Sequence, residues 1–149
     1  MKTIWACVLV ALTVGVAWAA ATPPTADLKL AAPDANPEVA TIYRGTLGEA
    51  VVQVTLSHDA DDPDHLVGEY FIFGGGNTIL LAGEITDDNF YMEESEDGSA
   101  ISGYWEGKLV IEGNKGFIIG LWMNNEESVK KPFKLERVMR SRSMIKRVS

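Results

Sequence analysis

The sequence predicts an all-β fold in which about eight antiparallel strands form an up-and-down meander that closes into a β-barrel. Short apolar runs recur along the chain with turn residues between them, a spacing typical of antiparallel sheets. The run 50–57 alternates strictly, with Val52, Val54 and Leu56 on one face and polar residues on the other. Glycines within the strands favour a barrel over the alternative, a two-sheet sandwich, because coiled strands need positions without a Cβ atom. These glycines are Gly68, Gly83, Gly103, Gly107 and Gly120.

Residues 1–20 are expected to form a signal peptide rather than part of the fold. A single charge at Lys2 precedes the apolar run 4–16, and the alanine-rich sequence that follows predicts cleavage near Ala19–Ala21. The alternative is an uncleaved membrane anchor, because the uncharged stretch 3–26 is long enough to span a bilayer. We therefore expect a periplasmic or secreted protein.

Residues 21–40 are expected to be a flexible linker, because they hold four of the six prolines and show no apolar period. The barrel domain is predicted over 41–140, and a basic tail over 141–149. Glycine, asparagine and aspartate clusters separate the strands, because these residues accept the backbone angles of tight turns. The predicted strands span 42–47, 50–57, 66–73, 78–86, 90–94, 100–111, 117–123 and 132–138.

A succession of strands that combine glycine and aromatic residues resembles segments of known protein families. Its elements are Gly68-Glu69-Tyr70, Ile79-Leu80-Leu81-Ala82-Gly83, Tyr91-Met92-Glu93-Glu94, Gly103-Tyr104-Trp105-Glu106-Gly107, Gly120-Leu121-Trp122 and Pro132-Phe133-Lys134-Leu135. This succession resembles a small module of uncharacterised exported bacterial proteins and is more distantly similar to the eight-stranded barrels of the lipocalin and avidin class. The resemblance covers about residues 41–138 and implies a fold. The ligand residues that define those barrels have no counterpart here, so it implies no functional residue.

Charge is distributed unevenly along the chain. The 149 residues include 13 Lys and Arg against 21 Asp and Glu, and this acidity argues against nucleic acid as a partner. Residues 45–129 carry a net charge of −15, whereas residues 130–149 carry +7. The basic end could contact an anionic surface such as a membrane or polymer, neutralise the barrel of its own chain, or be solvated.

Aromatic residues in the predicted strands are the candidates for ligand binding, since indoles and phenols commonly line pockets. The alternative is that they fill the barrel, because a glycine beside an aromatic residue gives the small and large alternation of a tapering interior. The candidates are Tyr70, Tyr104, Trp105 and Trp122.

The loop 58–65 is the candidate metal site. Its carboxylates could bind calcium and its histidines a transition metal, although neither an EF-hand pattern nor a zinc spacing is present. The alternative is a solvated hairpin loop. The candidate ligands are His58, Asp59, Asp61, Asp64 and His65.

Motifs for catalysis are absent from the sequence. There is no G-x-S-x-G, the glycine run 74–76 precedes a strand rather than a helix, and the one cysteine, Cys7, lies in the expected signal peptide. We therefore expect a non-catalytic, monomeric binding module without a cofactor other than possible calcium, whose partner is a small apolar ligand or an extracytoplasmic protein. A second hypothesis is an inhibitor of an extracellular enzyme that presents loop 58–65 to a basic cleft. A third is a carboxylate-based hydrolase that uses acids within 87–97.

Overall fold

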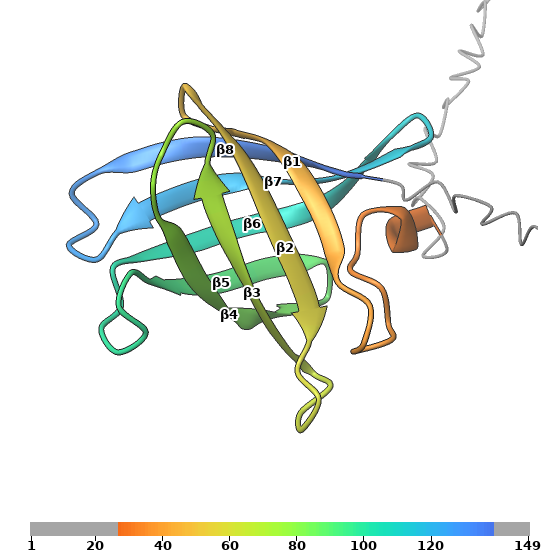
Figure 1. The fold of residues 1–149 in the computed structure, drawn as a ribbon. Helices are drawn as coiled ribbons and strands as arrows, with labels where there is room; N and C mark the ends of the chain where they lie inside the picture. Colours follow the sequence, from red (N-terminus) through yellow and green to blue (C-terminus); the bar gives the residue numbers. More distant parts are fainter. Residues whose placement is uncertain (1–26, 139–149) are drawn as a thin grey trace, which may run out of the picture.

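The computed structural model describes residues 27–138, in which eight antiparallel strands form one closed barrel (Figure 1). Each strand pairs with the next, and β1 pairs with β8 to close the sheet, so the predicted barrel is confirmed and the sandwich is wrong. The expected signal peptide and the tail 141–149 lie outside the described residues. The strands are β1 Thr41–Leu47, β2 Ala50–His58, β3 His65–Ile72, β4 Thr78–Thr86, β5 Asn89–Ser95, β6 Gly103–Glu112, β7 Lys115–Asn124 and β8 Lys130–Arg137.

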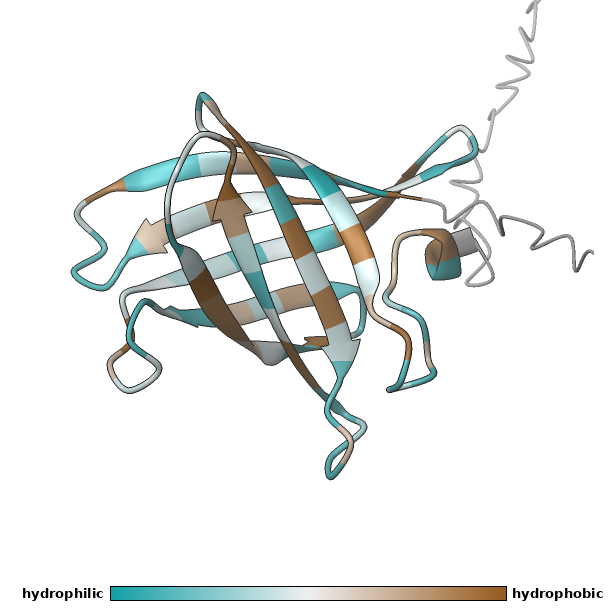
Figure 2. Cartoon of the chain, viewed as in Figure 1, coloured by the Kyte–Doolittle hydropathy of each residue, from teal (hydrophilic) through white to brown (hydrophobic). Residues whose placement is uncertain are grey.

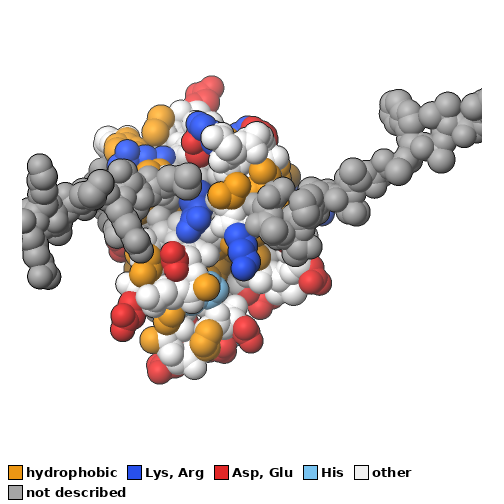
Figure 3. Space-filling view, turned by 90° about the vertical axis from the view of Figure 1, so that its right-hand side faces the viewer, with side chains coloured by type: hydrophobic (Ala, Val, Ile, Leu, Met, Phe, Trp, Pro, Cys, Tyr) orange, Lys and Arg blue, Asp and Glu red, His pale blue; other side chains and the backbone are white. Residues whose placement is uncertain are grey.

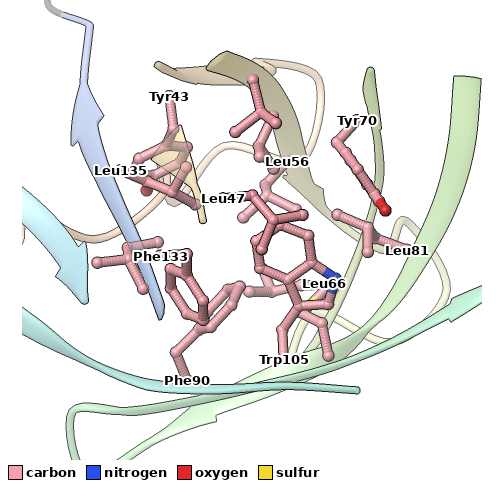
Figure 4. Packing of buried hydrophobic residues seen from close by; sticks show 14 of the residues in the cluster. Tyr43, Leu47, Leu56, Leu66, Tyr70, Leu81, Phe90, Trp105, Phe133 and Leu135 are labelled. Atoms are coloured by element: carbon pink, nitrogen blue, oxygen red, sulfur yellow. The ribbon is translucent and has the colours of Figure 1, made fainter. Parts of the chain in front are cut away.

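Alternation along the strands separates a packed interior from a solvated exterior, as the bands of hydropathy in Figure 2 show. Trp105 lies near the middle of the interior, with its ring centroid 4.9 Å from that of Phe133 and 5.0 Å from that of Tyr70 (Figure 4). Phe90 packs against Phe133 from the other side, and all of these side chains are buried. Large side chains therefore fill the barrel.

The meander gives the barrel two different ends. The distal end carries the hairpin loops 48–49, 73–77, 96–102 and 125–129. The proximal end carries the other three loops, 59–64, 87–88 and 113–114, together with both ends of the described chain. No helix within residues 27–138 has the length and apolar character needed to cross a membrane.

A short segment before β1 packs against the proximal end of the barrel. The 3₁₀-helix η1 (Asp27–Leu30) contacts β6 and β7, and Ala31 is completely buried. The Tyr43 hydroxyl donates a hydrogen bond to the Ala31 carbonyl oxygen at 2.8 Å. Burial raises the pKa of Tyr43 above its usual range, which keeps this donor protonated, although the positive charge of Arg137 opposes the shift.

The flexible linker predicted over 21–40 is therefore wrong for its described, packed part. Its prolines exclude regular strands, but Leu28 and Ala31 still contribute apolar surface to the core. Residues 21–26 lie outside the described residues.

Substitution Gly116→Ala should detach this segment while leaving the barrel closed. A Cβ atom at Gly116 would overlap the Leu30 carbonyl oxygen, which belongs to η1 rather than to a barrel strand. Amide hydrogen exchange should show loss of protection at residues 28–32 and retained protection in β2 to β5. Gly76→Ala is the matched control, because nothing lies within 4 Å of a Cβ atom there. Equal protection of residues 28–32 in both variants would contradict the packing described.

Candidate functional site

Glu94 is the one charged residue with a buried side chain among residues 27–138. It shares a face of β5 with Phe90 and Met92, so its carboxylate points into the barrel near the distal end. Only 3 % of Glu94 is exposed. A carboxylate in such a position requires donors, because burial without hydrogen bonds costs several kcal/mol (about 2–7 even for a neutral polar group).

Two donors, one from β3 and one from β6, converge on one carboxylate oxygen of Glu94. The Tyr70 hydroxyl donates to Oε2 at 2.8 Å, and Nε1 of Trp105 donates to the same oxygen at 2.9 Å. The hydroxyl of Ser102 lies 3.3 Å from Oε1 and makes a longer hydrogen bond. Burial, followed by the charge of Glu94, raises the pKa of Tyr70, so the phenol remains a donor throughout the physiological range.

An unpaired donor lies beside this carboxylate. Trp122 is opposite Trp105 in the register of β6 and β7 and therefore points inward, and its Nε1 atom is buried without a hydrogen-bond partner among residues 27–138. A Cβ atom added at Gly103 would lie 2.9 Å from both Trp122 Nε1 and Glu94 Oε1. Gly103 thus allows the Trp122 indole and the Glu94 carboxylate to approach one backbone position that a side chain would obstruct.

Three of the four predicted ligand-binding residues meet in this cluster. Tyr70, Trp105 and Trp122 surround Glu94, whereas Tyr104 points outward and lies against Tyr91, with ring centroids 6.4 Å apart. Tyr104 neighbours Trp105 along β6, and successive side chains of a strand point to opposite faces. Glu94 could have been identified as an inward-facing residue from the sequence, because it continues the alternation of Phe90 and Met92 along the same strand.

Neither comparison found a relative. A scan against protein-family models and a search of curated proteins gave no match.

Three of the five candidate metal ligands in loop 58–65, His58, Asp59 and His65, make side-chain hydrogen bonds within the loop, whereas the Asp61 and Asp64 side chains are exposed. Asp59 Oδ1 accepts the backbone N–H of Asp61 at 2.8 Å, and His58 Nδ1 lies 2.6 Å from the Pro63 carbonyl oxygen. His65 Nδ1 lies 2.9 Å from a carboxylate oxygen of Asp62, and the candidate Asp64 is exposed. Within the described residues, no three His, Cys, Asp or Glu side chains form a group that could hold a metal ion. The structure thus does not bring these side chains together as a ligand set.

Exposed apolar side chains gather at the distal end and form what we call the apolar rim. Their exposed fractions range from 38 % for Ile101 to 54 % for Val51. Leu80 and Ile101 also line a groove of about 360 Å³ on the outside of β3 to β5. The apolar rim consists of Val51, Phe73, Leu80, Ile101, Leu121 and Val129.

The loops around the apolar rim are acidic. Five exposed carboxylates belong to the distal loops, and the nearby bases are Lys130 and Lys131 at the start of β8. Asp97 is held by its own loop, where Oδ1 accepts the backbone N–H groups of Ser99 at 2.8 Å and Ala100 at 2.9 Å. The acids are Glu49, Glu96, Asp97, Glu126 and Glu127.

Substitution Glu94→Ala should lower the free energy of unfolding by about 2–4 kcal/mol, because it leaves the buried donors of Tyr70 and Trp105 without an acceptor. Chemical denaturation measures the change. Glu106→Ala is the control, since Glu106 is exposed on the outer wall and its loss should change stability by less than about 0.5 kcal/mol. Equal effects of the two substitutions would show that the Glu94 cluster does not stabilise the barrel.

The Asp97 carboxyl should titrate near pH 2. The backbone N–H groups of Ala100 and Ser99 lower its pKa from 3.8 to about 2 by stabilising the carboxylate. A depressed pKa means that the ordering of the loop by Asp97 is fully present above pH 3.8 and is lost as the pH falls through about 2. Carboxyl chemical shifts measured by NMR test this prediction, and a midpoint near 3.8 would refute it.

Proposed function

We propose that the protein is a non-catalytic, exported binding module that engages a protein partner through the apolar rim. The observation that carries this proposal is the concentration of exposed apolar side chains at one end. Six of the seven large hydrophobic residues that are exposed in the described chain belong to the rim. Exposed apolar groups bounded by polar residues are typical of interaction surfaces.

The packed interior favours this surface over an internal apolar ligand. Trp105 is 1 % exposed and Phe133 and Phe90 are each 2 % exposed, and their rings contact one another across the middle of the barrel. A ligand of lipid size would have to displace these side chains, each of which contributes a few kcal/mol through burial (about 1.5–3). The outer surface offers apolar contacts without this cost.

The charge of the distal loops specifies the partner further. Five exposed carboxylates surround the rim, and charge complementarity raises association rates and selects partners of opposite sign. We therefore propose a partner segment that combines basic and apolar side chains. Such a segment would place its apolar residues on Leu80 and Ile101, which line one groove, and its cations near Glu96 and Asp97 in the same loop as Ile101.

The inhibitor hypothesis has one supporting observation, which is the preorganisation of loop 58–65. The His65 N–H donates to the Asp62 carbonyl oxygen and the Asp59 N–H to the His65 carbonyl oxygen, both at 2.9 Å. An exposed loop fixed by its own hydrogen bonds loses little entropy on entering a basic cleft. Slower turnover of an extracellular hydrolase, reversed by Asp61→Ala and Asp64→Ala, would favour this second function.

A photo-crosslinking phenylalanine analogue in place of Phe73 or Leu121 should give specific adducts with an extracytoplasmic protein. The same analogue in place of Tyr91 is the control, because Tyr91 is also exposed but lies outside the rim. We expect rim adducts to exceed those of the control at least about tenfold, consistent with a localised interface.

Adducts of equal yield at all three positions, or at none, would contradict the proposal. A change in tryptophan emission on adding a long-chain fatty acid, with no rim adducts, would support an internal ligand instead.

A further inference from the structure

We propose that the outer wall of β4 to β6 binds a polyamine, a small organic cation whose amino groups are spaced along an alkyl chain. The binding surface, which we call the tyrosine face, consists of Glu84, Tyr91, Glu93, Tyr104 and Glu106. Binding at this surface does not depend on the proposed protein partner, because the tyrosine face lies outside the apolar rim and takes a small molecule.

Strand pairing places all five side chains on one outward surface. Tyr91 is opposite Glu84 on β4 and opposite Glu106 on β6, and Glu93 is opposite Tyr104. The residues that alternate with Tyr91 and Glu93 along β5 are buried in the core, so these two side chains and their cross-strand partners face outward. The Tyr91 ring therefore lies between two carboxylates, and the carboxylate of Glu93 is beside it.

Two aromatic rings and two shallow hollows give the tyrosine face its shape. The ring centroids of Tyr91 and Tyr104 lie 6.4 Å apart, with an angle of 30° between the ring planes. A hollow of about 290 Å³ lies beside Tyr91 on β4, and another of about 390 Å³ lies beside it on β6. Exposed aromatic rings attract cations and also pack against methylene groups.

The three carboxylates of the tyrosine face have no ion-pair partner among residues 27–138. No salt bridge in this range includes Glu84, Glu93 or Glu106. Lys108 lines the hollow on β6, so the immediate surface carries three negative charges and one positive charge. Partial burial, followed by the nearby negative charges, raises the pKa of Tyr91 above its usual value, so the phenol remains neutral.

The proximal loops beside this wall add to its negative potential. Loops 59–64 and 87–88 adjoin β3, β4 and β5 and carry six carboxylates. Figure 3 shows the proximal end, with several Lys and Arg side chains towards the middle and Asp and Glu mostly at the margin. The acids at the margin thus extend the negative potential of the tyrosine face, which attracts cations.

The spacing of the carboxylates favours a long organic cation over a single metal ion. Glu84 and Glu106 belong to strands on either side of β5, so their backbones are separated by two strand spacings, or about 10 Å. Within the described residues, no three His, Cys, Asp or Glu side chains could hold one metal ion together. A polyamine can place an ammonium group at each carboxylate while its methylene groups cross the Tyr91 ring.

Isothermal titration calorimetry of the full chain with spermidine tests the carboxylates. Glu84→Gln with Glu106→Gln should raise the dissociation constant at least about tenfold, because two charged contacts are lost. Glu38→Gln with Glu112→Gln is the matched control, since it removes the same charge from other exposed positions and should leave the affinity unchanged. An unchanged denaturation midpoint shows that each variant is folded.

The same titration tests the aromatic ring. Tyr91→Leu should raise the dissociation constant about two- to fivefold, which corresponds to the loss of an exposed cation–π contact. Tyr91→Phe keeps the ring and should bind spermidine as the wild type does.

Absence of spermidine binding to the wild type would overturn the inference. Equal losses in the two glutamine pairs would also overturn it, because they would indicate diffuse attraction to an acidic protein. So would equal affinities of Tyr91→Leu and Tyr91→Phe, or displacement of spermidine by an equal concentration of magnesium. Crosslinking from the rim tests the protein partner separately.

Discussion

The pairing of β1 with β8 is the constraint on which the rest of the structure depends. Five residue pairs, from Tyr43 opposite Arg137 to Leu47 opposite Phe133, form this seam and leave no unpaired sheet edge. Gly45 makes the close approach possible, because a Cβ atom there would overlap the Lys134 carbonyl oxygen. Once the sheet is closed, inward side chains must fill the interior, and the loops must divide between two ends.

Closure of the barrel also explains why the interior is filled with side chains while other apolar side chains remain exposed at the distal end. The interior of an eight-stranded barrel is just wide enough for side chains. The buried Glu94 is compatible with this packing because Tyr70 and Trp105 supply its hydrogen bonds from adjacent positions in the core. The apolar surface that the core does not use lies on the distal loops and the adjoining strand ends, where a partner can reach it.

The sequence was informative where a local pattern determines the structure. Alternation in 50–57 and the glycine-rich turn after Phe73 predict strands that the structure places within a few residues of the expected bounds. The alternation also predicts which side of β2 is buried, since Val52, Val54 and Leu56 are all in the core. Tyr70 and Trp105 lie in the packed core, the placement that the alternative of barrel filling predicted, and their role in ligand binding stays a prediction.

Features that depend on distant contacts could not be predicted in the same way. Glu94 stands among several acids in sequence, and only pairing of β5 with β6 and the approach of β3 reveal its donors. Packing of Ala31 depends on a gap at Gly116, which is 85 residues further along the chain. Trp105 points into the barrel and Tyr104 points outward only because successive residues of a strand face opposite sides. A shift of one residue in the register would have exchanged the two side chains.

The most direct test is amide hydrogen exchange of the full chain with and without a synthetic peptide that combines lysine and leucine residues. The peptide should protect the distal loops 48–49, 73–77, 96–102 and 125–129 and leave the proximal loops unchanged. Exchange in the strands around Trp105 should also be unaffected, because the interior is filled. Protection confined to the proximal end, or increased exchange around Trp105, would contradict the central claim that this barrel binds through its distal rim.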